Sequence, residues 1–153
     1  MSTKRLTRGA IIAGLYIVIT YILAPVSFGP LQFRASEALT VLPIIYPEAI
    51  PALFIGCLIS NIFGGLGLVD IIGGSLVTLV AAYFTYYFRG SILAYLSPVV
   101  LNGLLISIYL KVLFDLPYWL TAIEIAASEA LVVFLLGYPL IYYLKKRGLD
   151  VTL

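Results

Sequence analysis

The stretch YWLTAIEIAASEALVVFLLGYPLIYYL at residues 118–144 decides the fold class, because it is long and apolar and carries charge only at Glu124 and Glu129. An α-helix rises by about 1.5 Å per residue, so roughly 20 apolar residues are enough to cross a hydrocarbon core of about 30 Å. Basic residues, Lys145, Lys146 and Arg147, follow the stretch directly. The pattern predicts a transmembrane helix that ends at a membrane surface.

Apolar segments also fill most of the chain before this stretch. They cover residues 7–24, 35–46, 52–63, 71–88 and 93–114. The segment at 35–46 is short and contains Pro43, so we expect a tilted, broken or partly re-entrant element whose free backbone groups are covered by protein or water. The sequence therefore predicts an all-α integral membrane fold, a single domain over residues 1–153 with a bundle of six transmembrane helices, the second one short or broken.

Proline and glycine residues mark the ends of these segments. Pro25, Gly29 and Pro30 are expected to end the first segment, and Pro47 and Pro51 are expected to form a tight corner before the third.

Composition excludes several classes of protein. Of 153 residues, 63% are hydrophobic and 10% are charged, whereas a soluble domain is about 25% charged. The chain has no histidine and one cysteine, Cys57, so it offers no disulfide framework, zinc cluster or Cys/His nucleophile pair. It has no Walker-type glycine-rich loop either. We therefore expect no metal site, no cofactor and no catalytic residues in this chain.

Basic residues predict the orientation, because cytoplasmic loops carry an excess of Lys and Arg. With six crossings, Arg34 and Lys111 fall on one side of the membrane. The other side receives Lys4, Arg5, Arg8, Arg89, Lys145, Lys146 and Arg147. This imbalance predicts a multi-pass protein of the plasma membrane with both termini in the cytoplasm. The net charge of +2 is also better explained by basic residues at the ends of the membrane segments than by nucleic-acid binding.

Polar residues inside apolar segments are the candidates for function, because an acid at the centre of a bilayer costs about 2.5–3.5 kcal/mol on insertion scales. The candidate binding residues are Arg34, Glu37, Asn61, Asp70, Asn102, Trp119, Glu124 and Glu129. Most of them fall near the outer side in the expected topology, where they predict a substrate-receiving pocket.

Simpler interpretations of the same residues remain open. Arg34 and Glu37 have the spacing of a helical salt bridge, and Asp70 suits a wet loop at the membrane surface. Asn102 suits either a binding donor or an interhelical hydrogen bond. Glu129 lies deep in its segment. On a helix it is rotated by about 140° from Glu124, so the two acids are not expected to belong to the same site.

Two further patterns also have two interpretations each. Trp119 belongs either to the aromatic belt at the membrane surface or to a stacking site for a flat heterocycle. Small residues in the first segment, Gly9 with Ala13 and Ala10 with Gly14, allow another helix to approach closely. That helix belongs either to this chain or to a partner subunit.

The stretches QFRASEALTVLP (32–43), PEAIPALFIGCLISNIFGG (47–65), VDIIGGSLVTLVAA and YWLTAIEIAASEALVVFLLGYPL resemble the queuosine-precursor transporter family. Members of this family are substrate-binding S components of energy-coupling factor (ECF) transporters. The resemblance covers nearly the whole chain. It implies a six-helix S component that binds a 7-deazaguanine, such as preQ1, preQ0 or queuine, from outside the cell.

The resemblance also implies partner proteins. An S component docks on a coupling membrane subunit, and two ATPase subunits of the complex use the ATP. In S components, small residues of the first helix meet the coupling subunit as an Ala-xxx-Ala pattern. Ala10 and Gly14 match that pattern here, with glycine in the second position, and Ala13 lies beside them.

Two other classes of function fit the residues alone. A stand-alone ion- or proton-coupled carrier would use Glu124 and Glu129 as a relay. An intramembrane enzyme would use paired acids, although the missing histidines weaken this hypothesis.

Overall fold

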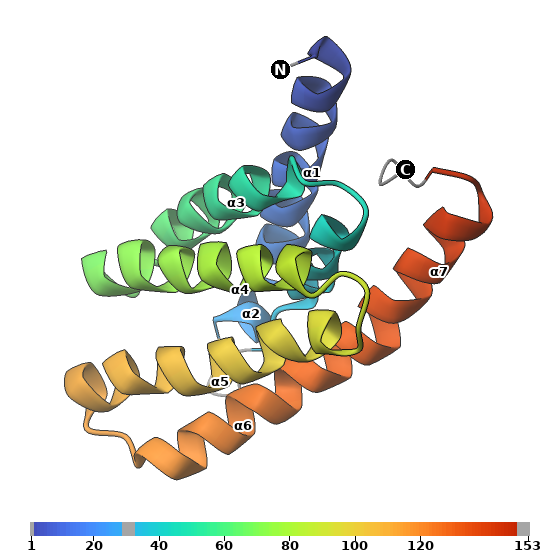
Figure 1. The fold of residues 1–153 in the computed structure, drawn as a ribbon. Helices are drawn as coiled ribbons and strands as arrows, with labels where there is room; N and C mark the ends of the chain where they lie inside the picture. The colour runs from blue at the N-terminus through green and yellow to red at the C-terminus, as the bar shows by residue number, and fades with distance from the viewer. Residues whose placement is uncertain (1, 29–32, 150–153) are drawn as a thin grey trace.

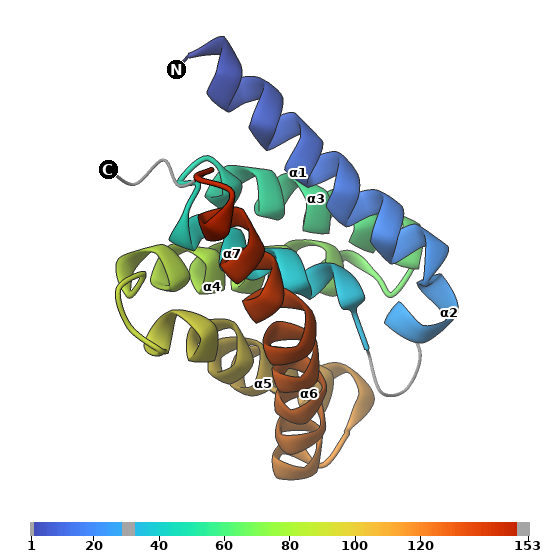
Figure 2. The ribbon, with the colours of Figure 1, turned by 90° about the vertical axis from the view of Figure 1, so that its right-hand side faces the viewer.

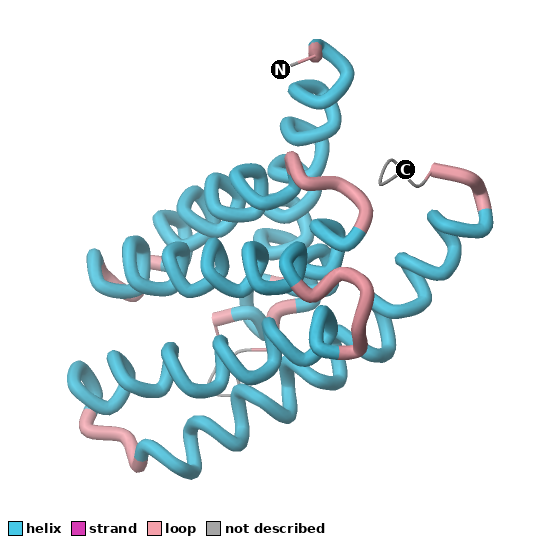
Figure 3. The backbone as a smooth tube through the Cα atoms, viewed as in Figure 1, coloured by secondary structure: helices cyan, strands magenta, loops and turns pink. Residues whose placement is uncertain are grey.

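The computed structural model describes residues 2–28 and 33–149, and over these residues the chain is helical with no strand (Figure 3). In chain order the elements are α1 (Thr3–Ile22), α2 (Ala24–Ser27), the 3-10 helix η1 (Ala35–Ile44), α3 (Ala49–Gly64), the π-helix η2 (Asp70–Gly74), α4 (Ser75–Tyr87), α5 (Leu93–Phe114), α6 (Tyr118–Val132), the π-helix η3 (Val133–Gly137) and α7 (Tyr138–Lys146). The expected all-α architecture is confirmed. Gly29 and Pro30, and Gln32 at the start of the quoted motif, lie outside the described residues.

Three helices of the described chain are long and apolar enough to cross a membrane. They are Thr3–Ile22, Leu93–Phe114 and the continuous run Tyr118–Lys146. Large apolar side chains such as Val18, Ile108 and Leu135 are more than half exposed on these helices. An exposed apolar surface of this extent is typical of helices that face lipid. The count of six crossings and the cytoplasmic position of both termini stay predictions.

Helices α3, α4 and α5 and the continuous run from α6 to α7 go back and forth between two ends of the bundle, whereas α1 runs across them (Figure 1). The α3–α4 and α5–α6 connections lie at one end. The η1–α3 corner, the α4–α5 turn and the carboxyl end of α7 lie at the other. The second end includes Arg89, in the turn between α4 and α5, and the basic residues at the end of α7 and just after it, Lys145, Lys146 and Arg147.

The short element η1 lies at the centre of the bundle (Figure 2). It contacts α1, α3, α4, α5, α6 and α7, and all of its residues after Ala35 are buried. The expected short, broken element is therefore a 3-10 helix with Pro43 inside it. Protein covers it on all sides, which satisfies the condition for irregular backbone in a membrane protein.

The ends of two helices differ from the sequence expectation. Helix α3 begins at Ala49 rather than residue 52, so Pro51 lies in its first turn, where the missing N–H group of proline breaks no helical hydrogen bond. Pro25 does not stop helical structure either. It lies in the first turn of the short helix α2, which continues after α1 ends at Ile22.

Candidate functional site

Buried polar side chains meet where η1 contacts the surrounding helices. We call this group the polar cluster; it consists of Tyr16, Arg34, Glu37, Cys57, Asn61, Asp70, Asn102, Tyr109 and Glu129. Apart from Tyr109, each of these residues is at most 8% exposed. They come from α1, the start of η1, α3, η2, α5 and α6. The cluster thus joins segments that lie far apart in the sequence.

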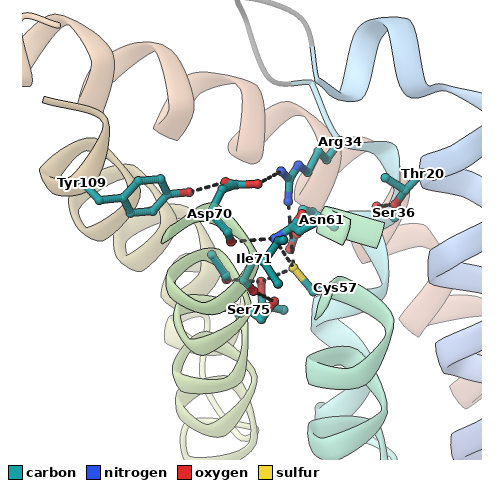
Figure 4. Close-up of polar contacts among 12 residues, drawn as sticks. Thr20, Arg34, Ser36, Cys57, Asn61, Asp70, Ile71, Ser75 and Tyr109 are labelled. Carbon is teal, nitrogen blue, oxygen red and sulfur yellow. Dashed lines mark hydrogen bonds and ion pairs between the residues drawn. The ribbon is translucent and has the colours of Figure 1, made fainter. Parts of the chain in front are cut away.

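One side of the polar cluster is organised around Asp70 (Figure 4). The guanidinium Nη2 of Arg34 lies 3.8 Å from Asp70 Oδ2, and the hydroxyl of Tyr109 donates a 2.9 Å hydrogen bond to Asp70 Oδ1. Asn61 donates to the backbone carbonyl of Asp70 at 3.0 Å. The ring of Phe28 lies 5.1 Å from the Arg34 guanidinium. These contacts hold the Arg34 and Asp70 side chains in place.

The other side contains two acids. The hydroxyl of Tyr16 donates a hydrogen bond to Glu37 Oε1. The side-chain amide of Asn102 donates a 2.9 Å hydrogen bond to Glu129 Oε1. The carboxyl groups of Glu37 and Glu129 interact electrostatically with each other and with Arg34. Neither acid forms an ion pair within the described residues.

Local backbone geometry explains how Asp70 reaches the polar cluster. Asp70 opens the π-helix η2, a form that often occurs as a single turn at functional sites. Gly74 closes η2 and has no side chain. A Cβ atom there would lie 2.9 Å from Asn61 Nδ2 and 3.4 Å from the Tyr109 hydroxyl. Glycine therefore leaves room for the Asn61 and Tyr109 side chains to contact Asp70.

Several polar atoms of the polar cluster have no hydrogen-bond partner. Within the described part of the chain these atoms are Arg34 Nε, Glu37 Oε2, Asn61 Oδ1, Asp70 Oδ2 and Asn102 Oδ1. A buried polar group without a partner costs about 1–3 kcal/mol. These five buried atoms therefore keep a capacity for hydrogen bonding that the protein's own groups do not use.

The structure brings together six of the eight binding residues expected from the sequence. They are Arg34, Glu37, Asn61, Asp70, Asn102 and Glu129. It places the other two elsewhere. Trp119 is 70% exposed, and Glu124 lies on the exposed face of α6, as its rotation from Glu129 predicts.

The simpler interpretation of Arg34, Glu37 and Asp70 is wrong. The three residues are 8%, 3% and 2% exposed, so they do not face water. Arg34 forms its ion pair with Asp70 across the bundle rather than with Glu37 in the same segment. Of the two interpretations of Asn102, the structure shows the interhelical hydrogen bond, which Asn102 donates to Glu129. A role of Asn102 in ligand binding stays a prediction.

Sequence reasoning missed three members of the polar cluster. Neither Tyr16 nor Tyr109 is among the binding residues expected from the sequence, and Cys57 was considered only as the one cysteine of the chain. Thr78, Asn61 and Arg34 surround the Cys57 sulfur at 3.4–3.9 Å. One signal was available for Tyr16, because it lies well inside the first apolar segment and away from either membrane surface.

The small residues of the first segment lie on an open groove between α1 and α3. The groove has a volume of about 420 Å³. It is lined by Leu6, Gly9, Ala10, Ala13, Glu48, Pro51, Ala52 and Ile55. Ala10 is exposed, Ala13 is half-buried, and a Cβ atom on Gly14 would meet nothing within 4 Å. This face of α1 is therefore only partly covered by the chain itself.

The architecture and the polar cluster define a helical membrane protein with a buried polar centre. Comparison with known families makes the assignment specific. The profile described as QueT transporter matches residues 6–146. The chain therefore belongs to the QueT transporter family, which confirms the resemblance found in the sequence.

A curated relative is the queuosine precursor transporter QueT of Lactococcus lactis subsp. cremoris (strain MG1363). It is 45% identical over 73 residues, which are 46% of this chain and 43% of the relative. The match therefore spans less than half of the relative's length. No solved structure matches the chain.

Proposed function

We propose that this chain is the substrate-binding S component of an ATP-driven ECF importer in the bacterial cell membrane. It captures a queuosine precursor, a 7-deazaguanine such as preQ1, preQ0 or queuine, from the outer side. Membership of the QueT transporter family and the name of the curated relative support this proposal. The observation that carries it is the polar cluster, where buried acceptors lack partners in an otherwise apolar bundle.

The chemistry of the polar cluster suits a guanine-like ring. The edge of such a ring presents adjacent N–H donors, and a carboxylate accepts two parallel hydrogen bonds. Glu37 and Glu129 both keep carboxylate oxygens close to this centre. Asn61 and Asn102 offer amide groups for the ring carbonyl and nitrogens.

The proposed energy source lies outside the chain. Two ATPase subunits would hydrolyse ATP and act through a coupling membrane subunit. This chain, as a single domain, would bind the substrate and would not hydrolyse ATP. The groove between α1 and α3 is the proposed docking face. Ala10 and Ala13 line it, and Gly14 follows one helical turn after Ala10. Small side chains there permit a close approach by a partner helix.

Binding without an energy source tests the proposed function. The purified chain should bind a 7-deazaguanine by calorimetry in the absence of ATP, sodium and a proton gradient. Uptake by the chain alone into liposomes, driven by an ion gradient, would favour a stand-alone carrier. Chemical conversion of the bound compound would favour an enzyme.

A pair of variants on α6 locates the site. Glu129→Gln removes a buried carboxylate, so affinity should fall by at least tenfold while the fold is kept. Glu124→Gln makes the same change on the exposed face and should leave affinity unaltered. Equal affinity for both variants would exclude Glu129 from the site.

A further inference from the structure

We propose that an anionic phospholipid binds in the groove between α4 and α5, with an acyl chain along the groove and its phosphate group at Arg89. This lipid site shares no residue with the polar cluster. It therefore goes beyond the proposed function and does not depend on it.

The groove follows the contact between α4 and α5, which lie side by side (Figure 1). It has a volume of about 310 Å³. Its lining includes Phe84 and Phe88 of α4 and, on α5, Leu93, Leu96, Ser97 and Val100. The α5 residues recur at spacings of three and four, so they form one face of the helix. This face begins beside the α4–α5 turn and extends for about 10 Å along α5.

The lining suits a hydrocarbon chain. The rings of Phe84 and Phe88 are stacked with an angle of 20° between their planes, so they form a flat apolar wall. Ser97 adds a hydroxyl, but this group donates a 2.7 Å hydrogen bond to the Leu93 carbonyl of its own helix. Phe84, Leu93 and Val100 are 38%, 45% and 49% exposed. The groove is therefore open on the outside of the bundle, where the hydrocarbon core holds lipid and no water.

The size of the lining side chains distinguishes an acyl chain from a partner helix. Close packing of membrane helices is favoured by small residues at the contact. The groove between α1 and α3 has Gly9, Ala10 and Ala13 in its lining. In the groove between α4 and α5, Ser97 is the small residue, and the others are phenylalanine, leucine and valine. A flexible acyl chain can follow such a surface more closely than a rigid helix can.

Arg89 places a positive charge at the end of the groove. It follows Phe88 in the α4–α5 turn and is exposed. Its guanidinium lies 4.6 Å from the Tyr86 ring and donates a hydrogen bond to the Tyr86 carbonyl, but it forms no ion pair within the described residues. The sequence has no acid between Asp70 and Asp115 that could neutralise it locally. A guanidinium binds phosphate through paired hydrogen bonds, so the remaining donors of Arg89 suit a lipid phosphate.

The experiment compares two phospholipids with identical acyl chains. Phosphatidylcholine carries its own cation beside the phosphate, whereas phosphatidylglycerol has a net negative charge. Native mass spectrometry of the purified full chain with equal amounts of both should show about fivefold more bound phosphatidylglycerol, the effect of one basic residue near an anionic surface. Arg89→Gln should bring this ratio to about one. Lys111→Gln is the control, because it removes an exposed cation from the last turn of α5, at the opposite end of the helix.

A second pair of variants tests the groove itself. Ser97→Phe fills it, so the binding of both lipids should fall by at least half. Ser97→Ala keeps it open and should leave binding unchanged. The Ser97 side chain points to the outside of the bundle, so neither change disturbs the packed interior.

Four results would overturn the proposal. The first is equal binding of the two lipids by the unaltered chain, a comparison that needs no variant to fold. The second is an unchanged ratio in Arg89→Gln, and the third is undiminished binding to Ser97→Phe. The fourth is a loss of preference in Lys111→Gln as large as in Arg89→Gln, because general surface charge would then explain the preference.

Discussion

Asn102 on α5 donates a 2.9 Å hydrogen bond to Glu129 on α6, and both side chains are buried where the two helices pack together. The bond leaves Asn102 Oδ1 without a partner. The pair therefore fixes the position of an acid in the bundle interior and keeps an acceptor available beside it.

Replacing Asn102 by leucine should lower both stability and ligand affinity. An average interhelical hydrogen bond in a membrane protein contributes about 0.6 kcal/mol, but an acceptor left buried without its donor costs about 1–3 kcal/mol. We expect a loss of about 1 kcal/mol, seen as a lower midpoint of thermal unfolding in detergent. Ser107→Ala is the matched control, because Ser107 is buried on the same helix and donates to the carbonyl of Gly103 in its own helix. An unchanged ligand affinity in the leucine variant would remove Asn102 from the site.

Adding a methyl group at Gly74 should abolish ligand binding while the chain still folds. The new Cβ would lie 2.9 Å from Asn61 Nδ2 and 3.5 Å from Asp70 Oδ1, so the Asn61 side chain must shift away from Asp70. Gly73→Ala is the control, since its Cβ would make only an ordinary contact, 3.7 Å from the ring of Tyr109. Calorimetry of the two variants checks the prediction, and full affinity in Gly74→Ala contradicts it.

Breaking the ion pair between Arg8 and Glu48 should destabilise the chain without changing ligand affinity. The two groups lie 2.6 Å apart, with side chains that are 20% and 3% exposed. Exposed pairs contribute about 0–1 kcal/mol, and removing one partner of a buried pair costs about 3–5 kcal/mol. We therefore expect Arg8→Gln, which leaves Glu48 unpaired, to cost about 1–3 kcal/mol by thermal unfolding.

The double variant tests the cause of that loss. If the cost comes from an uncompensated buried charge, adding Glu48→Gln to Arg8→Gln should recover part of the stability. No recovery would indicate that packing of Arg8 on the Tyr46 ring, 4.1 Å away, is responsible.

A bulky residue at Ala10 should block transport and spare binding. Ala10→Trp fills the groove between α1 and α3, so a partner helix can no longer approach closely. Uptake of labelled ligand into cells that carry the complete transporter should fall by at least tenfold, with unchanged affinity of the purified chain. Val18→Trp is the control, because Val18 is 52% exposed on the same helix and does not line the groove. Normal uptake by Ala10→Trp would exclude this face from docking.

The sequence by itself determined the local features of this protein. The length and hydropathy of residues 93–114 predict a helix with the bounds that α5 has in the structure. Pro43 in a short apolar segment predicts the irregular element that proves to be η1. Helical rotation separates Glu124 from Glu129. All of these depend on neighbours within a few turns of the chain, and backbone geometry relates such neighbours directly. The sequence motifs that resemble the queuosine-precursor transporter family also predicted the family to which the chain belongs.

The tertiary structure alone decided which polar groups meet. Arg34 pairs with Asp70 rather than Glu37, which is closer in sequence, because η1 lies at the centre of the bundle and directs Arg34 toward η2. Tyr16 and Tyr109 join the polar cluster from α1 and α5 by contacting Glu37 and Asp70. Partners across a helical bundle depend on how whole helices pack and rotate against one another, and hydropathy and spacing along one segment do not specify that packing.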